Sequence, residues 1–139
     1  MIDLARFSLD GRAAIITGGS GGIGRACAMA FAKAGANIVI ASLPPESIAP
    51  VVQEVEGLGV KGLGLAVDVS DEAQVKALVE QTLAKFGRID ALVNVAGGSY
   101  SRNPDMPAFN RAPLLELAPA DFMTAYAVNT KSAFLCAKA

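Results

Sequence analysis

The residues best suited to chemistry lie in a glycine-rich stretch near the N-terminus, Thr17-Gly18-Gly19-Ser20-Gly21-Gly22-Ile23-Gly24. The stretch follows a short apolar run at residues 13–16 and opens an alanine-rich segment with the spacing of a helix. Strand, glycine-rich turn and helix form an arrangement whose backbone N–H groups and helix N-terminus can hold a diphosphate. Two templates overlap here, Gly19-x-Gly21-x-x-Gly24 and Gly18-x-x-x-Gly22-x-Gly24. The stretch therefore predicts nucleotide binding.

Two polar residues follow or end later apolar runs and are further candidates for a ligand site. Asp68 closes the run at residues 64–67, and Asn94 lies within the run at residues 90–95. The carboxyl ends of parallel strands meet at one edge of a sheet, where ligands bind. Each residue also has a purely structural interpretation: Asp68 as a turn residue before Ser70, and Asn94 as a turn residue at the end of its strand.

Asn129 is the third polar candidate. It shares a helical stripe with Phe122 and Tyr126, so we expect it to be at least partly buried. A buried amide needs hydrogen-bond partners, which are supplied either by a functional site or by a neighbouring backbone group.

Alternating strand and helix patterns must position these residues. A Rossmann-type, doubly wound parallel sheet between two helical layers, with right-handed crossovers, is the predicted α/β fold. The loop at residues 98–118 shows no period, and Pro50 fits only a first helical turn. Ser70 is the expected N-cap of the third helix. The predicted strands span residues 13–17, 37–42, 64–68 and 90–95, and the helices span about 23–34, 48–55, 71–86 and 119–139.

Composition narrows the function classes. The 139 residues carry a net charge of −1, which argues against nucleic acid or an anionic membrane surface as a partner, and no apolar run has membrane-spanning length. The chain has no histidine, so a Ser-His-Asp hydrolase is excluded and a metal site is not expected. Cys27 and Cys136 lie in apolar helical patterns, which favours reduced thiols and a cytoplasmic protein. The length indicates one domain over residues 1–139.

The spacing Thr17-Gly18-x-x-x-Gly22-Ile23-Gly24 resembles the short-chain dehydrogenase/reductase family. Three further motifs occur in the family's order: Asp68 after the third strand, Asn94-Val95-Ala96-Gly97 after the fourth with one substitution, and Val128-Asn129 in the last helix. The resemblance covers nearly the whole chain. It implies an oxidoreductase that uses NAD or NADP to interconvert a small-molecule alcohol and a carbonyl compound.

The resemblance also implies a role for each matching residue. Asn129 would belong to the catalytic machinery and help to organise a water and proton relay. Ser20 would lie near the adenosine ribose and Ile23 near the nicotinamide-side phosphate and ribose. The remaining cofactor residues would surround the phosphates (Gly18, Gly22, Gly24), hold the adenine edge (Asp68, Val69) and line the ribose side (Asn94, Ala96, Gly97).

The end of the second strand bears on the choice of cofactor. An NAD-preferring dinucleotide fold usually has an acid there to hold the ribose 2′-hydroxyl. This chain has Ala41-Ser42-Leu43, with no acid to repel a 2′-phosphate and no arginine to attract one. Ser42 and Ser20 can donate to a phosphate, which favours NADP over NAD by a small margin.

The family's Tyr-x-x-x-Lys acid/base pair does not occur in these 139 residues. Four residues after each tyrosine, where the motif requires lysine, Tyr100 is followed by Pro104 and Tyr126 by Thr130. We therefore expect a cofactor-binding portion, incomplete on its C-terminal side and inactive alone, with an exposed fourth-strand edge and an exposed apolar face on the last helix. Family members are commonly dimers or tetramers through that helix. In the loop, Ser99, Tyr100, Arg102 and Arg111 are either substrate contacts or solvated side chains.

Two other function classes remain as alternatives. A nucleotide-binding module without catalysis, or an inactive fragment, would need the glycine turn but gives no reason for Asn129. An S-adenosylmethionine-dependent methyltransferase shares a glycine-rich first turn, but it gives no reason for Asn129 or for Asn94-x-Ala96-Gly97.

Overall fold

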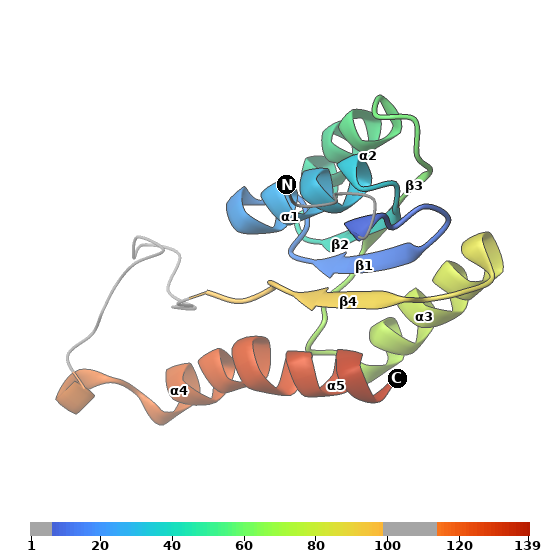
Figure 1. Ribbon diagram of the computed structural model, residues 1–139. Coiled ribbons are helices and arrows are strands. Elements are labelled where there is room, and N and C mark those ends of the chain that lie inside the picture. The colour runs from blue at the N-terminus through green and yellow to red at the C-terminus, as the bar shows by residue number, and fades with distance from the viewer. Residues whose placement is uncertain (1–6, 99–113) are drawn as a thin grey trace.

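A parallel sheet in the strand order β3-β2-β1-β4 is the centre of the molecule. The computed structural model describes residues 7–98 and 114–139 (Figure 1). Every strand pair is parallel, as the sequence predicts. The strands are β1 (Ala13–Thr17), β2 (Asn37–Ser42), β3 (Gly62–Ala66) and β4 (Ala91–Asn94).

Helices cover both faces of this sheet and make a three-layer α/β/α arrangement (Figure 1). One layer contains α1 (Gly22–Lys33) and α2 (Ile48–Glu56), and the other contains α3 (Glu72–Phe86) and α5 (Ser132–Lys138). The described residues also include α4 (Pro119–Tyr126) and short 3₁₀ turns at Pro45–Ser47 and Leu114–Glu116. A π-helical turn, Ala127–Lys131, joins α4 to α5, and we call it the π turn.

The alternation of side chains along β1 divides the core in two. Ala14 and Ile16 pack on the side of α1 and α2, whereas Ile15 packs on the side of α3 and α5. All five residues of β1 are buried, and four of them are apolar, as expected of a central strand covered on both faces. The α1 side also contains Ala28 and Ala32, whose small side chains let the helix lie close to the sheet.

The order of the strands creates a topological switch point. The chain proceeds outward from β1 to β2 and β3, and then returns through α3 to place β4 on the other side of β1. Thr17, the last residue of β1, lies opposite Asn94, the last residue of β4. Ligands of doubly wound sheets bind in the crevice beyond such a pair of strand ends.

The bounds of the third strand differ most from the sequence prediction, and β4 is one residue shorter at each end than predicted. The third strand is Gly62–Ala66 rather than residues 64–68, because pairing with β2 begins at Ile38 opposite Gly62. Glycines at positions 62 and 64 face α2 and contribute no apolar pattern, so the strand's start was not visible in the sequence. Pro50 does lie in the first turn of α2, as expected.

The N-cap of α3 is also corrected. Asp71, not Ser70, caps the helix: its Oδ1 accepts the N–H groups of Ala73 at 2.8 Å and Gln74 at 3.2 Å. The Ser70 hydroxyl is engaged one turn earlier, where it donates to Asp68 Oδ1 at 2.7 Å. Both residues are N-cap formers, and the local hydrogen bonds decide between them.

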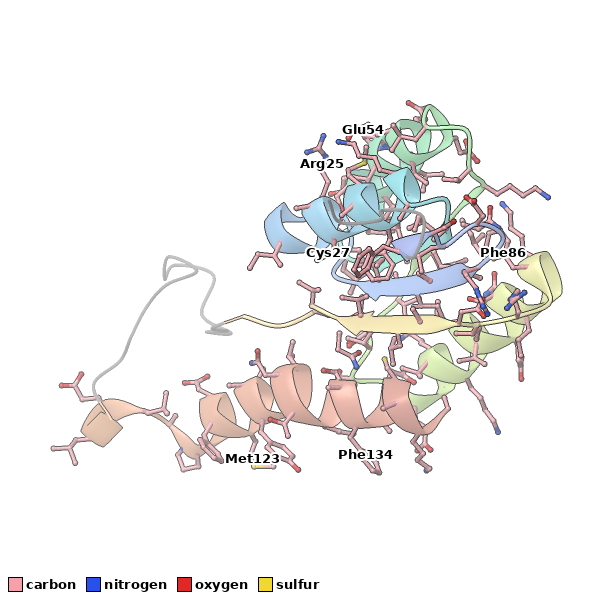
Figure 2. The ribbon with its side chains drawn as sticks, viewed as in Figure 1. Arg25, Cys27, Glu54, Phe86, Met123 and Phe134 are labelled. Carbon is pink, nitrogen blue, oxygen red and sulfur yellow. The ribbon has the colours of Figure 1, made fainter. Side chains whose placement is uncertain are left out.

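The last predicted helix is interrupted, and the burial predicted for Asn129 is wrong. The π turn breaks the stripe that would have aligned Asn129 with Phe122 and Tyr126, and all three residues are exposed. The predicted exposed features are confirmed. Within the described residues β4 is an edge strand, and the outer face of the helix is apolar: Met123 and Phe134 point away from the sheet (Figure 2).

Candidate nucleotide-binding site

A cleft of about 350 Å³ opens beyond the carboxyl ends of β1, β2 and β4, at the switch point. Its walls come from the glycine-rich turn, the ends of β2, β3 and β4, and the π turn. The lining residues are Gly18, Ser20, Gly21, Ile23, Gly24, Ala41, Ser42, Leu43, Val67, Asp68, Val95, Ala96, Gly97 and Val128. The cleft therefore gathers segments from the first 24 residues to the last helical region.

Glycine is required at two positions of the turn. Gly18 has a φ of +64°, and a Cβ atom there would lie 2.9 Å from the backbone of Ala96. A Cβ atom on Gly24 would lie 2.1 Å from the Gly18 carbonyl oxygen, well inside contact distance. The turn thus packs against α1 and against the segment after β4 by backbone contact alone.

The N-terminus of α1 opens toward the cleft. Its N-cap residue, Gly21, has an extended backbone, and no side chain caps the helix. The first N–H groups of a helix lack partners within the helix and carry a partial positive charge. Ile23 and Gly24 of this first turn both line the cleft, which gives the site a preference for an anionic group such as a phosphate.

Thr17 joins the glycine turn to the end of β4. Its hydroxyl oxygen accepts hydrogen bonds from the N–H groups of Val95 at 3.1 Å and Ala96 at 3.2 Å. Thr17 is 1% exposed, so these two backbone groups are paired in a water-poor environment. In the sequence Thr17 is marked only as the first residue of the glycine-rich motif, and no further signal indicates these hydrogen bonds.

Three serine hydroxyls meet at the β2 side of the cleft. Ser20 Oγ lies 2.6 Å from Ser42 Oγ and 2.7 Å from Ser47 Oγ, and Ser47 donates to the Pro44 carbonyl at 2.6 Å. We call Ser20, Ser42 and Ser47 the serine cluster. Each hydroxyl carries a single hydrogen and can both donate and accept, so the cluster can rearrange its hydrogens toward an incoming acceptor. Ser47 was not a sequence candidate, because no motif contains it.

The loop after β3 forms the opposite end of the cleft. Asp68 Oδ1 accepts the backbone N–H of Ser70 at 2.9 Å as well as its hydroxyl, and the Asp68 N–H donates to Gln74 Oε1 at 2.9 Å. Asp68 therefore has the turn geometry considered from the sequence and also lines the cleft. Val67 and Val69 on either side are buried in the core, so they anchor the loop.

Asn129 holds the segment after β4. Its Oδ1 accepts the Gly98 N–H at 2.9 Å, and its Nδ2 donates to the carbonyls of Gly98 at 2.9 Å and Ala125 at 2.8 Å. The bond to Ala125 occupies a carbonyl on the preceding turn of the helix. The side chain thus fixes backbone rather than pointing freely into the cleft.

Most of the residues proposed from the sequence converge on the cleft. Its lining includes Gly18, Ser20, Ile23, Gly24, Ser42, Asp68, Ala96 and Gly97, but not Gly22, Val69, Asn94 or Asn129. Gly22 begins α1 and Asn94 ends β4 beside the cleft, whereas Val69 points into the core. The cleft also has lining residues that were not predicted from the sequence and that contribute backbone or apolar surface: Gly21, Ala41, Leu43, Val67, Val95 and Val128. Ser99, Tyr100, Arg102 and Arg111 lie outside the described residues.

Charge in the cleft is sparse. Asp68 is the single ionisable side chain in its lining. Arg25 follows the lining residue Gly24 in α1, but its side chain makes an ion pair with Glu54 of α2 on the outer surface (Figure 2). At the start of α3, hydrogen bonds from Gln74, first from its backbone N–H, lower the pKa of Asp71. Among residues 7–98 and 114–139, no three His, Cys, Asp or Glu side chains gather as a metal site would need.

The parallel sheet with helices on both faces and a cleft at its switch point defines a Rossmann-like α/β protein, and comparison with known proteins narrows this class. The family model for short chain dehydrogenases matches residues 12–139. The chain is 36% identical over 134 residues to the 7alpha-hydroxysteroid dehydrogenase of Escherichia coli K12, covering 96% of this chain and 48% of that protein. It is 37% identical over 133 residues to the D-threitol dehydrogenase of Mycolicibacterium smegmatis, covering 96% and 47%. The chain belongs to the short-chain dehydrogenase family.

Solved structures show the same relationship. A 7α-hydroxysteroid dehydrogenase in complex with NADH and 7-oxoglycochenodeoxycholic acid superposes with a TM-score of 0.81 at 35% identity, over 99% of this chain and 50% of that one. A dehydrogenase/reductase from Sinorhizobium meliloti 1021 gives a TM-score of 0.85 at 32% identity, over 97% and 50%. The chain spans about half the length of these two structures.

Proposed function

We propose that the protein is an NAD(P)-dependent oxidoreductase that transfers a hydride between a nicotinamide and an alcohol/carbonyl substrate, and that residues 1–139 form its cofactor-binding portion. The observation that carries the proposal is the single cleft into which the glycine turn, Asp68 and the Ala96-Gly97 segment all open. Membership of the short-chain dehydrogenase family supports it. The alternative is a nucleotide-binding module without catalysis.

The cleft fits a dinucleotide in its chemistry. Gly18, Gly22 and Gly24 would hold the diphosphate beside the N-terminus of α1, where a side chain on Gly24 would collide with backbone. Asp68 and Val69 would hold the adenine edge, and Ser20 the adenosine ribose. Ile23, Asn94, Ala96 and Gly97 would line the ribose and phosphate on the nicotinamide side. The cofactor supplies the hydride chemistry, and these residues bind and orient it.

Asn129 is our proposed catalytic residue within these 139 residues. By the family resemblance it would help to organise a water and proton relay. Its hydrogen bonds to both backbone groups of Gly98 fix the segment after β4 against the π turn. A relay needs donors and acceptors held within hydrogen-bond reach of one another, and these hydrogen bonds would hold the Asn129 side chain in a fixed orientation.

For the cofactor, we propose NADP rather than NAD. Ser42 ends β2 at the place where an acid would repel a 2′-phosphate. The serine cluster presents three hydroxyls there, and hydroxyls can donate to phosphate oxygens. No positive charge lines the cleft, so the preference is small. The structural relative described above was solved with NADH, which makes the comparison of NADPH with NADH the decisive measurement.

Calorimetric titration of residues 1–139 with NADPH and NADH tests binding and preference together. We expect both to bind, NADPH more tightly. Replacing Ser42 with Asp introduces a buried acid at the cluster and should reverse the preference by repelling the 2′-phosphate. Ser8→Asp, an equal charge change on an exposed residue at the opposite end of β1, should leave both affinities unchanged. Absence of binding by either dinucleotide would overturn the proposal, and tighter NADH binding would overturn the NADP preference.

We expect residues 1–139 alone to give no turnover, because they contain no Tyr-x-x-x-Lys pattern to move the proton. An assay of NADPH oxidation with a panel of ketones checks this expectation. The same assay with the full-length protein discriminates the enzyme from the non-catalytic module: turnover supports the enzyme, and its absence with intact cofactor binding supports the module.

We further propose that the complete protein is a homodimer or homotetramer through the outer face of α4 and α5. Phe122 is 59% exposed, Met123 58% and Phe134 62%, which is a large apolar surface for a protein that works alone. Light scattering on the full-length protein checks this proposal.

Both cysteines are free thiols, which supports a cytoplasmic location. None of the described helices is long and apolar enough to cross a bilayer.

A further inference from the structure

The π turn lies between the two loops that end the cleft. Val128 lines the cleft directly. On one side of it Asn129 holds Gly98 after β4, and on the other side the Lys131 ammonium donates to the Ser70 carbonyl after β3 at 3.0 Å. Residues separated by 31 and 61 positions are thereby joined through one short helical turn.

The loop reached by Lys131 has few other hydrogen bonds beyond its own neighbourhood, apart from the Val67 N–H, which donates to the Ser42 carbonyl at 3.3 Å. Asp68 bonds to Ser70 and Gln74, which are both within six residues of it. Val67 and Val69 anchor the loop from below through the apolar core, where Val69 shares a cluster with Leu135 of α5. The bond from Lys131 acts on the polar side of the loop and connects it to a different element.

We propose that Lys131 is a positioning residue for the cofactor: by holding the Ser70 carbonyl it fixes the loop at residues 67–70 in the conformation that receives the adenine. The inference rests on the proposed dinucleotide function, since Asp68 and Val69 are the residues assigned to the adenine edge. Lys131 does not line the cleft, and it acts through the loop. π-Helical turns occur frequently at functional sites, because the extra residue re-aims the side chains on either side.

A lysine seven residues further along supplies a matched control. Lys138 on α5 also reaches the start of α3, where its Nζ pairs with Glu72 Oε1 at 3.1 Å. Both lysines are exposed, and both connect the last helical region to the segment in which α3 begins. Only Lys131 touches the loop that lines the cleft, so a general role in helix packing would affect both variants alike.

The experiment uses the full-length protein and two ligands, NADPH and reduced nicotinamide mononucleotide, which lacks the adenosine half. Lys131→Met keeps the alkyl stem and removes the ammonium group. We expect it to raise the dissociation constant of NADPH by about three- to tenfold, the range of one typical hydrogen bond exposed to water, and to leave that of the mononucleotide within about twofold. Lys131→Arg should restore NADPH affinity, and Lys138→Met should leave both ligands unchanged.

Three results would overturn the inference: unchanged NADPH affinity in Lys131→Met, an equal loss for both ligands, or the same loss in Lys138→Met. Hydrogen exchange without ligand separates this inference from the proposed function. Faster exchange at the amides of residues 68–71 in Lys131→Met, but not in Lys138→Met, is expected whether or not the protein binds a dinucleotide. If the wild-type protein bound neither ligand, the proposed function would fail, and unchanged exchange would show that Lys131 does not position the loop.

Discussion

The two walls of the cleft are built differently. The first wall is the glycine turn with β1 and β2 behind it, and all of β1 and most of β2 are shielded from solvent. The second wall is the π turn, which lies between α4 and α5. Neither the π turn nor α4 has a buried residue, and α5 buries only Ser132, Leu135 and Cys136. The first wall is set by contacts within the described residues. The second presents apolar side chains that another surface must cover to be stable in water.

This contrast separates binding from assembly. Substitutions in the first wall should act on folding and on the cofactor cleft, because backbone atoms there are in contact. Substitutions on the outer face of the second wall should leave the fold intact and act on what covers it. Residues of the same helices that face the core, such as Leu135, are the control, because their substitution should reduce stability.

Gly24→Ala should have the largest effect. The added methyl group would lie 2.1 Å from the Gly18 carbonyl oxygen and 2.9 Å from the Gly19 Cα, and neither backbone atom can rotate away. We expect a loss of more than about 3 kcal/mol in the free energy of unfolding, measured by urea denaturation, together with loss of NADPH binding. Gly22→Ala is the control, because a methyl group there meets no atom within 4 Å. Equal stability of the two variants would show that the turn relaxes.

Adjacent residues of α5 test the second wall. Leu135 is 5% exposed and packs in the core with Leu78, whereas Phe134 is 62% exposed. Leu135→Ala should cost about 2–4 kcal/mol of stability by urea denaturation. Phe134→Ala should change stability in residues 1–139 by less than about 0.5 kcal/mol and weaken self-association of the full-length protein in light scattering. A large loss of stability in Phe134→Ala would remove the distinction between the walls.

Thr17 is the junction between the first wall and β4. Thr17→Val keeps the shape and removes the oxygen that accepts the Val95 and Ala96 N–H groups. Two half-buried donors then lose their partner, and we expect a cost of about 2 kcal/mol with faster hydrogen exchange at both amides. Thr17→Ser retains the hydroxyl and should lose less. Unchanged exchange in Thr17→Val would mean that water replaces the hydroxyl.

The sequence predicted the first wall well for a physical reason. Its strands are fully buried apolar runs, and its turn needs glycine at fixed spacing, so both leave a pattern in the residue types. β1 has the predicted bounds, and the parallel order follows from the alternation of elements.

Features that depend on tertiary contacts were not visible in the same way. The serine cluster joins positions 20, 42 and 47, which no local motif relates, and the π turn interrupts a pattern that looks continuous. Asn129 is exposed together with Phe122 and Tyr126, so the stripe predicted to be partly buried faces solvent. Lys131 has no partner in its own helical stripe, and its contact with Ser70 appears only when the layers are assembled.

The smallest effect is expected at Asp90, and it depends on pH and on salt. At the start of β4 it accepts hydrogen bonds from Arg88, from the Ala13 N–H and from Arg12, and the Arg88 bond is the largest of the causes that hold its pKa far below the usual range. As the pH falls, Asp90 is therefore protonated at a higher pH in the unfolded chain than in the folded chain. The stability that this carboxylate contributes is present above about pH 4 and is lost as the pH falls toward the lower folded pKa.

Asp90→Asn should accordingly lower the urea midpoint at neutral pH and make its decline in acid shallower than in the wild type. Because the arginine side chains are about half exposed, added salt should reduce the difference. Glu80→Gln, the same change of charge at an exposed position on α3, should not alter the slope in this way. If the urea midpoint fell equally with pH in the wild type and in Asp90→Asn, residue 90 would hold β4 through the hydrogen bond from the Ala13 N–H, which an amide oxygen can also accept.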